Sequence, residues 1–175
     1  MTALAILLWP DPRLSQRCAE LGAGPGACTT LETLETLVGD MFQTMYEANG
    51  RGLAAPQVGQ MIRLFVMDTG WKAGDMRPMV CIDPEVVSVS EAQTVLAEGC
   101  LSIPGVVAEV TRPETITLEY TDLTGLRCRA VLEGADARCA QHELDHLDGK
   151  VHFDRLDPER RAALQADYAA ARGAA

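Results

Sequence analysis

The segment that most constrains this chain is residues 141–146, which read Gln-His-Glu-Leu-Asp-His. His142 and His146 stand four positions apart, so in a helix they lie one turn apart on one face and both imidazoles can reach a single metal ion. Glu143 lies beside the first histidine and can take a proton from a water molecule that the metal activates. The pattern is typical of metal-dependent hydrolases; the alternative is an ordinary helix that happens to carry two histidines. Because a catalytic metal needs a third protein ligand, the fold has to bring one to this helix.

The length and composition indicate one globular domain. A chain of 175 residues can bury one core, so we expect a single catalytic domain over residues 1–175, frayed from about residue 170 to 175. The formal net charge of −10 argues against nucleic acids and anionic membranes as partners, and no run of the ~18 apolar residues that a membrane span needs is present. The six cysteines form no CxxC pair and no basic segment precedes the apolar residues 4–9, so we expect free thiols and a cytoplasmic protein.

The apolar pattern predicts helices on both sides of a β-rich middle. One helix starts at Thr29, which forms a capping box with Glu32, and ends at Asn49. The histidine-bearing helix spans residues 135–147, and a last helix begins at Asp157. The expected strands are residues 4–9, 63–67, 79–82, 86–89, 93–97, 115–120 and 126–132. The fold class is therefore α+β: mixed, mainly antiparallel strands packed around a central HExxH helix, with N-terminal and C-terminal helices.

Two residues compete as the third metal ligand. His152 extends the helix motif to HExxHxxGxxH, the signature of metzincin proteases, but that class carries a Met-turn further along and the last methionine here is Met79. Cys100 lies in the segment 98–102, Glu-Gly-Cys-Leu-Ser, ahead of a turn. A lone cysteine is more often buried in a core than bound to a metal, so the residues alone leave both candidates open.

A third segment is rich in small residues. Residues 50–57 read Gly-Arg-Gly-Leu-Ala-Ala-Pro-Gln, which lets a backbone come close to a ligand or to another element. Gln57 adds a side-chain hydrogen-bond donor. These residues predict a tight loop that leads into the strand at residues 63–67.

The three segments 50–57, 98–102 and 141–146 occur in the order and approximate spacing of the peptide deformylases, which the chain resembles from about residue 4 to residue 156. The resemblance implies a metal-dependent hydrolase that removes the N-formyl group from N-formylmethionyl peptides of newly made proteins and releases formate. It also implies that Cys100, His142 and His146 hold one divalent metal ion, Fe²⁺, with Zn²⁺, Ni²⁺ and Co²⁺ as alternatives.

The resemblance also implies roles for further residues. Glu143 is the general base, and the side-chain amide of Gln57 and the backbone N–H of Leu101 stabilise the oxyanion. The residues that match the family's substrate pocket are Gly50, Arg51, Gly52, Gly99, Arg138 and Cys139. The implied partners are formylated nascent peptides and the ribosome exit region, without direct nucleic-acid binding and without a membrane.

Several pocket positions depart from the family pattern. Val107 stands where many members carry an arginine that contacts the substrate, Arg51 where the family has an aliphatic residue, and Ala135 and Asp136 replace an apolar pair. One hypothesis is that Arg51 takes over as an anchor for a peptide carbonyl or carboxylate; the other is that it extends into solvent. Two further interpretations stay open: a deformylase-like homologue with weak activity or a different N-acyl substrate, and an HExxHxxGxxH metallopeptidase that uses His152.

Overall fold

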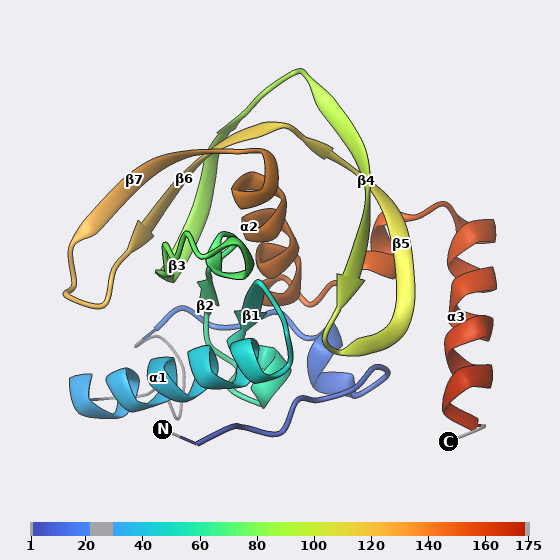
Figure 1. Ribbon diagram of the computed structural model, residues 1–175, viewed down its shortest axis with the longest axis horizontal. Helices are drawn as coiled ribbons and strands as arrows, with labels where there is room; N and C mark the ends of the chain where they lie inside the picture. Colours follow the sequence, from blue (N-terminus) through green and yellow to red (C-terminus); the bar gives the residue numbers. More distant parts are fainter. Residues whose placement is uncertain (1, 22–29, 174–175) are drawn as a thin grey trace.

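The computed structural model of the protein describes residues 2–21 and 30–173 (Figure 1). Its α-helices are α1 (Leu31–Glu47), α2 (Gly134–Leu147) and α3 (Pro158–Gly173). Its strands are β1 (Gly52–Ala54), β2 (Leu64–Met67), β3 (Met79–Val89), β4 (Gln93–Cys100), β5 (Ile103–Pro113), β6 (Thr115–Thr121) and β7 (Arg127–Glu133). No helix in the described ranges is long and apolar enough to cross a bilayer.

The strands form two antiparallel sheets around α2. One sheet has five strands in the order β1-β2-β3-β6-β7, and β4 and β5 pair as a separate two-stranded sheet. Helix α2 lies between the two sheets and contacts strands of both (Figure 1). The predicted α+β class with a central HExxH helix is therefore confirmed. Within the described residues, the only parallel pairing is an isolated bridge between Ala19 and Ile62.

Strand β2 explains how the helices are held, because all four of its residues are buried. Side chains alternate across a strand, so Leu64 and Val66 face α1 while Phe65 and Met67 face α2. Small residues on α2, Ala137 and Ala140, belong to the same cluster as Phe65 and are fully buried. The strand is thus covered on both faces, which fixes α2 and its histidines relative to the sheet.

Several predicted boundaries at the chain ends are wrong. Residues 4–9 form no strand; they make separate hydrogen bonds to different parts of the chain, including from the Leu7 N–H to the Gln57 carbonyl (2.7 Å) and from the Trp9 N–H to the Ser102 carbonyl (2.9 Å). The cap of α1 is Thr30, whose hydroxyl accepts from the Thr33 N–H; Thr29 lies outside the described residues. Helix α3 begins at Pro158, one residue after the predicted start, and ends at Gly173; residues 174–175 lie outside the described part.

The middle of the chain also differs from the prediction. Strand β3 continues through Asp83 and Pro84, where a break was expected, because it bulges there and Asp83 adopts a φ of 45°. The predicted loop at residues 50–57 contains β1, which pairs with β2. Strand β5 was not predicted. The predicted start of α2 is off by one residue, at Gly134 instead of residue 135.

Candidate active site

Cys100, His142 and His146 converge at one point. The Cys100 sulfur and one ring nitrogen from each histidine lie within 4.8 Å of one another, and no other such cluster occurs in the part of the chain that the structure describes. Cys100 ends β4, and its Sγ lies 3.3 Å from His146 Nε2. Burial lowers the pKa of His146 well below its usual value, which favours the neutral imidazole that a metal binds. One sulfur and two imidazole nitrogens are a donor set that suits iron, zinc or cobalt, so these residues fit a metal ion.

Glu98 orients the first of these histidines. Its Oε2 lies 3.0 Å from His142 Nδ1, which leaves His142 Nε2 to face the cluster. Burial opposes ionisation of Glu98, but hydrogen bonds from Arg112 and His142 outweigh it and hold the pKa of this carboxyl well below its usual range. Glu98 is therefore a carboxylate that fixes the tautomer and orientation of His142.

A buried ion network ties Glu98 to the rest of the fold. Arg112 on β5 donates from Nε and Nη2 to the two Glu98 oxygens, at 2.7 and 2.9 Å, and from Nη1 to Asp145 Oδ2 at 2.9 Å. Asp145 also pairs with Arg155. The network joins β4, β5 and α2. Arg112 on β5 thereby links Glu98, which orients His142, to the helix that carries both histidines. The sequence analysis missed the roles of Glu98, Arg112 and Asp145; the only signal was that Glu98 and Asp145 lie inside the recognised motifs.

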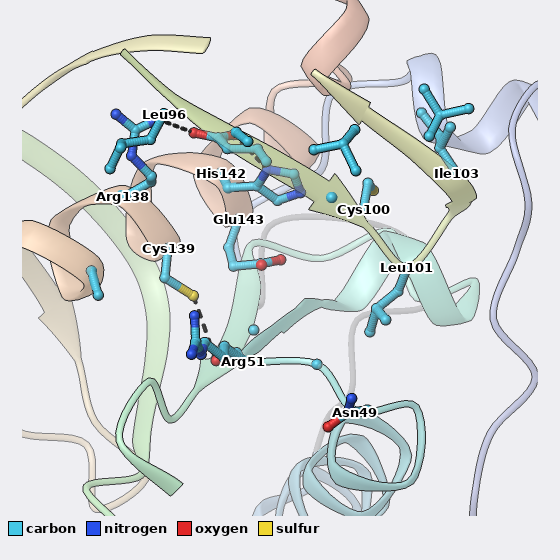
Figure 2. A pocket seen from close by; sticks show the side chains of 18 of the residues that line it. Asn49, Arg51, Leu96, Cys100, Leu101, Ile103, Arg138, Cys139, His142 and Glu143 are labelled. Carbon is cyan, nitrogen blue, oxygen red and sulfur yellow. Dashed lines mark hydrogen bonds and ion pairs between the residues drawn. The ribbon is translucent and has the colours of Figure 1, made fainter. Parts of the chain in front are cut away.

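Glu143 is buried with one free oxygen. Its Oε2 has no hydrogen-bond partner within the described residues, and its carboxylate points into the pocket (Figure 2). Burial raises the pKa of Glu143 to about 7, which suits a group that both takes and gives a proton near neutrality. Gly52 on β1 passes close by: a Cβ there would lie 2.8 Å from Glu143 Cδ and 2.7 Å from Cys139 Sγ. Only glycine allows this approach.

Gln57 and Leu101 stand beside Cys100. Gln57 lies in a short 3-10 helix, Ala55–Val58, and its Oε1 accepts the Ala54 N–H at 2.8 Å. This bond turns the NH₂ group toward the opposite side, where Nε2 lies 3.1 Å from Ser102 Oγ and 3.8 Å from Cys100 Sγ. Leu101 follows Cys100 in the turn between β4 and β5. The two predicted oxyanion donors therefore flank the cysteine.

A pocket of about 870 Å³ opens over this cluster. It is lined by all six residues that were expected to form the substrate pocket, Gly50, Arg51, Gly52, Gly99, Arg138 and Cys139 (Figure 2). Arg138 is held at the wall by Glu98 Oε1 at 2.6 Å and by the backbone carbonyls of Thr94 and Val110. Burial raises the pKa of the Cys139 thiol well above its usual value, so this thiol is neutral and donates to the Arg51 carbonyl.

His152 lies near the cluster but outside it. It is buried in the 3-10 helix His152–Arg155, with its ring centroid 4.7 Å from that of Phe153 and 6.3 Å from that of His142. It is not a member of the Cys100–His142–His146 group. The geometry therefore favours Cys100 over His152 as the third ligand.

Known proteins share both the sequence and the fold. A sequence model of the polypeptide deformylase family matches residues 3–162. A peptide deformylase of Stenotrophomonas maltophilia is 43% identical over 165 residues, 94% of each chain, and one of Xylella fastidiosa is 44% identical over 161 residues, 92% of this chain and 91% of the relative. The crystal structure of a peptide deformylase from Legionella pneumophila matches with a TM-score of 0.86 and 37% identity, covering 97% of this chain and 95% of the other. One from Ehrlichia chaffeensis in complex with actinonin matches with a TM-score of 0.84 and 36% identity, covering 94% of each chain. The chain belongs to the peptide deformylase family, whose members remove the N-formyl group from newly made polypeptides.

Proposed function

We propose that this peptide deformylase holds its catalytic metal with Cys100, His142 and His146 and uses Glu143 as its general base. The observation that supports this most directly is the convergence of the three ligand atoms within 4.8 Å, next to the unpaired carboxylate oxygen of Glu143. We propose Fe²⁺ as the native ion, with Zn²⁺, Ni²⁺ and Co²⁺ as alternatives that the same donor set accepts. A divalent ion held by these residues would lower the pKa of a water molecule to ~7 and would polarise the formyl carbonyl.

The chain's own residues move the proton and stabilise charge. Glu143 takes a proton from the attacking water and returns it to the amine as the C–N bond breaks, which yields formate and a free peptide N-terminus. The Gln57 amide and the Leu101 N–H donate hydrogen bonds to the oxygen that becomes negative. One such donor is typically worth about 3 kcal/mol of transition-state stabilisation. Gln57 is pre-oriented for this by its bond to the Ala54 N–H.

We further propose that the substrates are formylated nascent peptides, met in the cytoplasm near the ribosome exit region. The support is membership of a family that processes the N-termini of newly made polypeptides during protein biosynthesis. The single-domain organisation over residues 1–175 remains a prediction.

A second candidate is a homologue with weak deformylase activity or another N-acyl substrate. Its support is the unusual pocket rim, where Val107 is 58% exposed and Arg51 is exposed as well. The intact Glu143 and Gln57 favour the deformylase, because a chain that only binds metal needs neither.

Formate release from a formyl-methionyl peptide tests the proposal. The protein is prepared without oxygen and loaded with Fe²⁺, and Glu143→Ala is measured beside it with its metal content. We expect turnover by the wild type and a loss of about 10²–10⁴-fold in the variant with the metal retained. Metal-loaded protein that releases no formate but hydrolyses acetylated peptides would favour the second candidate.

A further inference from the structure

The exposed charged residues that line the pocket are both basic. Among its charged lining residues, the carboxylates of Glu98 and Glu143 are buried, at 6% and 4% exposure. Arg51 and Lys72 are exposed. This is the reverse of the whole chain, whose formal net charge is −10. A solute that enters the pocket therefore meets a positive rim on an otherwise acidic protein.

Arg51 has a fixed backbone and a free side chain. Its carbonyl accepts the Asp68 N–H at 2.8 Å and the Cys139 thiol at 3.5 Å, which hold its Cα at the rim beside β1. Its guanidinium makes no hydrogen bond or ion pair within residues 2–21 and 30–173, so all five donors remain for a ligand.

Lys72 adds a second cation on the same rim. Its Nζ lies 2.5 Å from the Asn49 carbonyl and 5.6 Å from the centroid of the Trp71 ring. Neither partner carries a negative charge, so the ammonium charge is not neutralised. Arg138, the remaining basic lining residue, is engaged by Glu98 and two backbone carbonyls and is not available in this way.

The β4–β5 side of the pocket is apolar. Leu96 and Val107 are 54% and 58% exposed there, and Figure 2 shows Leu96 and Arg51 on different sides of the pocket. The pocket thus has one apolar wall and one basic rim. An acidic side chain close to this rim would be attracted by two cations, and a basic side chain would be repelled by them.

We propose that this deformylase selects formyl-methionyl peptides with an acidic side chain in one of the two residues after the methionine, through Arg51 and Lys72. The inference rests on the proposed function, because the peptide has to bind at the Cys100–His142–His146 centre. An exposed ion pair changes an equilibrium by about 2- to 5-fold. Two cations attract a glutamate and repel a lysine. We therefore expect kcat/KM to be about 10-fold higher for a peptide with glutamate than for the same peptide with lysine at that position.

The test uses peptides whose only variable charge is the residue of interest. They are the C-terminal amides of formyl-Met-X-Ser and formyl-Met-Ser-X, with X as Glu, Gln or Lys. We expect kcat/KM to fall in the order Glu, Gln, Lys for at least one position at low salt. The spread is expected to collapse in ~1 M NaCl, where the screening length is ~3 Å.

Charge variants assign the preference to the rim. Arg51→Glu is expected to abolish or reverse the glutamate preference and Arg51→Gln to weaken it, with thermal unfolding to confirm folding. Lys150→Glu makes the same change in net charge at an exposed lysine that does not line the pocket, and is expected to keep the wild-type ratio.

Two failures are distinguishable. Equal kcat/KM for all three residues at both positions, or an unchanged ratio in Arg51→Glu, would overturn the inference alone. If the iron-loaded wild type does not turn over even the glutamine peptides, the proposed function fails and the inference with it.

Discussion

Replacing Gly52 by alanine tests how closely β1 approaches the general base. The added Cβ would lie 2.7 Å from Cys139 Sγ and 2.8 Å from Glu143 Cδ. Non-bonded carbon atoms pack at about 3.5–4.0 Å, so the Glu143 carboxylate or the strand has to move by about 1 Å. A misplacement of about 1 Å at a reacting group costs about 10²-fold in rate. At about 1.36 kcal/mol per tenfold, this corresponds to about 2.7 kcal/mol of activation free energy.

The assay is kcat for formate release by the Gly52→Ala protein, with metal content and thermal midpoint measured on the same preparation. We expect kcat to fall about 10²-fold while one metal ion per chain is retained, because the clash is with the base and not with a ligand. Gly173→Ala is the control, since a Cβ there meets no atom within 4 Å. A Gly52→Ala enzyme with a wild-type kcat would refute the reasoning, because it would mean that Glu143 has room which the distances deny it.

Three other changes probe the network, the core and the pH response. Glu98→Gln breaks the buried pair with Arg112, so we expect urea unfolding to show a loss of about 3–5 kcal/mol and metal titration to show about 10–100-fold weaker binding. Phe65→Ala removes a fully buried ring and is expected to cost about 3–5 kcal/mol by the same unfolding assay. Burial lowers the pKa of His152 to about 4 from its ordinary 6.5, so below pH 6.5 the unfolded chain binds a proton that the folded chain refuses. The contribution of neutral His152 to the free energy of unfolding is therefore fully present above pH 6.5 and is lost as the pH falls toward 4. We expect His152→Gln to remove this part of the acid decline, measured by urea unfolding across that pH range.

Each of these has an outcome that contradicts it. Glu109→Gln is the control for Glu98→Gln, because Glu109 is an exposed partner of Arg160, and equal effects in both variants would show that the buried network adds nothing. For Phe65→Ala, a loss below about 1 kcal/mol would mean that the core closes around the gap. An identical acid decline in His152→Gln and the wild type would assign the decline to other groups.

The sequence was sufficient for the features that depend on local spacing. Two histidines four residues apart on a helix face one way whatever surrounds them, so the sequence alone predicted His142 and His146 on one face of a helix, where α2 carries them. Period-two alternation likewise predicted both ends of β6 and β7 to within one residue. The family resemblance then pointed to Cys100, which no spacing rule alone could do.

Features that depend on contacts between distant segments could not be predicted from local spacing. At the bulge, the Asp83 carboxylate accepts the Leu21 N–H at 2.9 Å, a contact between residues 62 positions apart in the chain. Strand β1 is three residues long and is a strand only because β2 pairs with it. The apolar segment at residues 4–9 has the composition of a strand, but it makes scattered hydrogen bonds, including those to the Gln57 and Ser102 carbonyls, and forms no ladder with another strand.

The third ligand shows the same division. The local spacing HExxHxxGxxH makes His152 a candidate, but after α2 the backbone turns through Gly149, with a φ of 72°, and the His152 ring packs on Phe153. The β4–β5 hairpin instead brings Cys100 Sγ to 3.3 Å from His146 Nε2, across 46 residues of sequence. Helical periodicity is a property of neighbouring residues and can be read from their order. Which hairpin reaches the helix depends on the packing of two sheets around it, and that is a property of the folded chain.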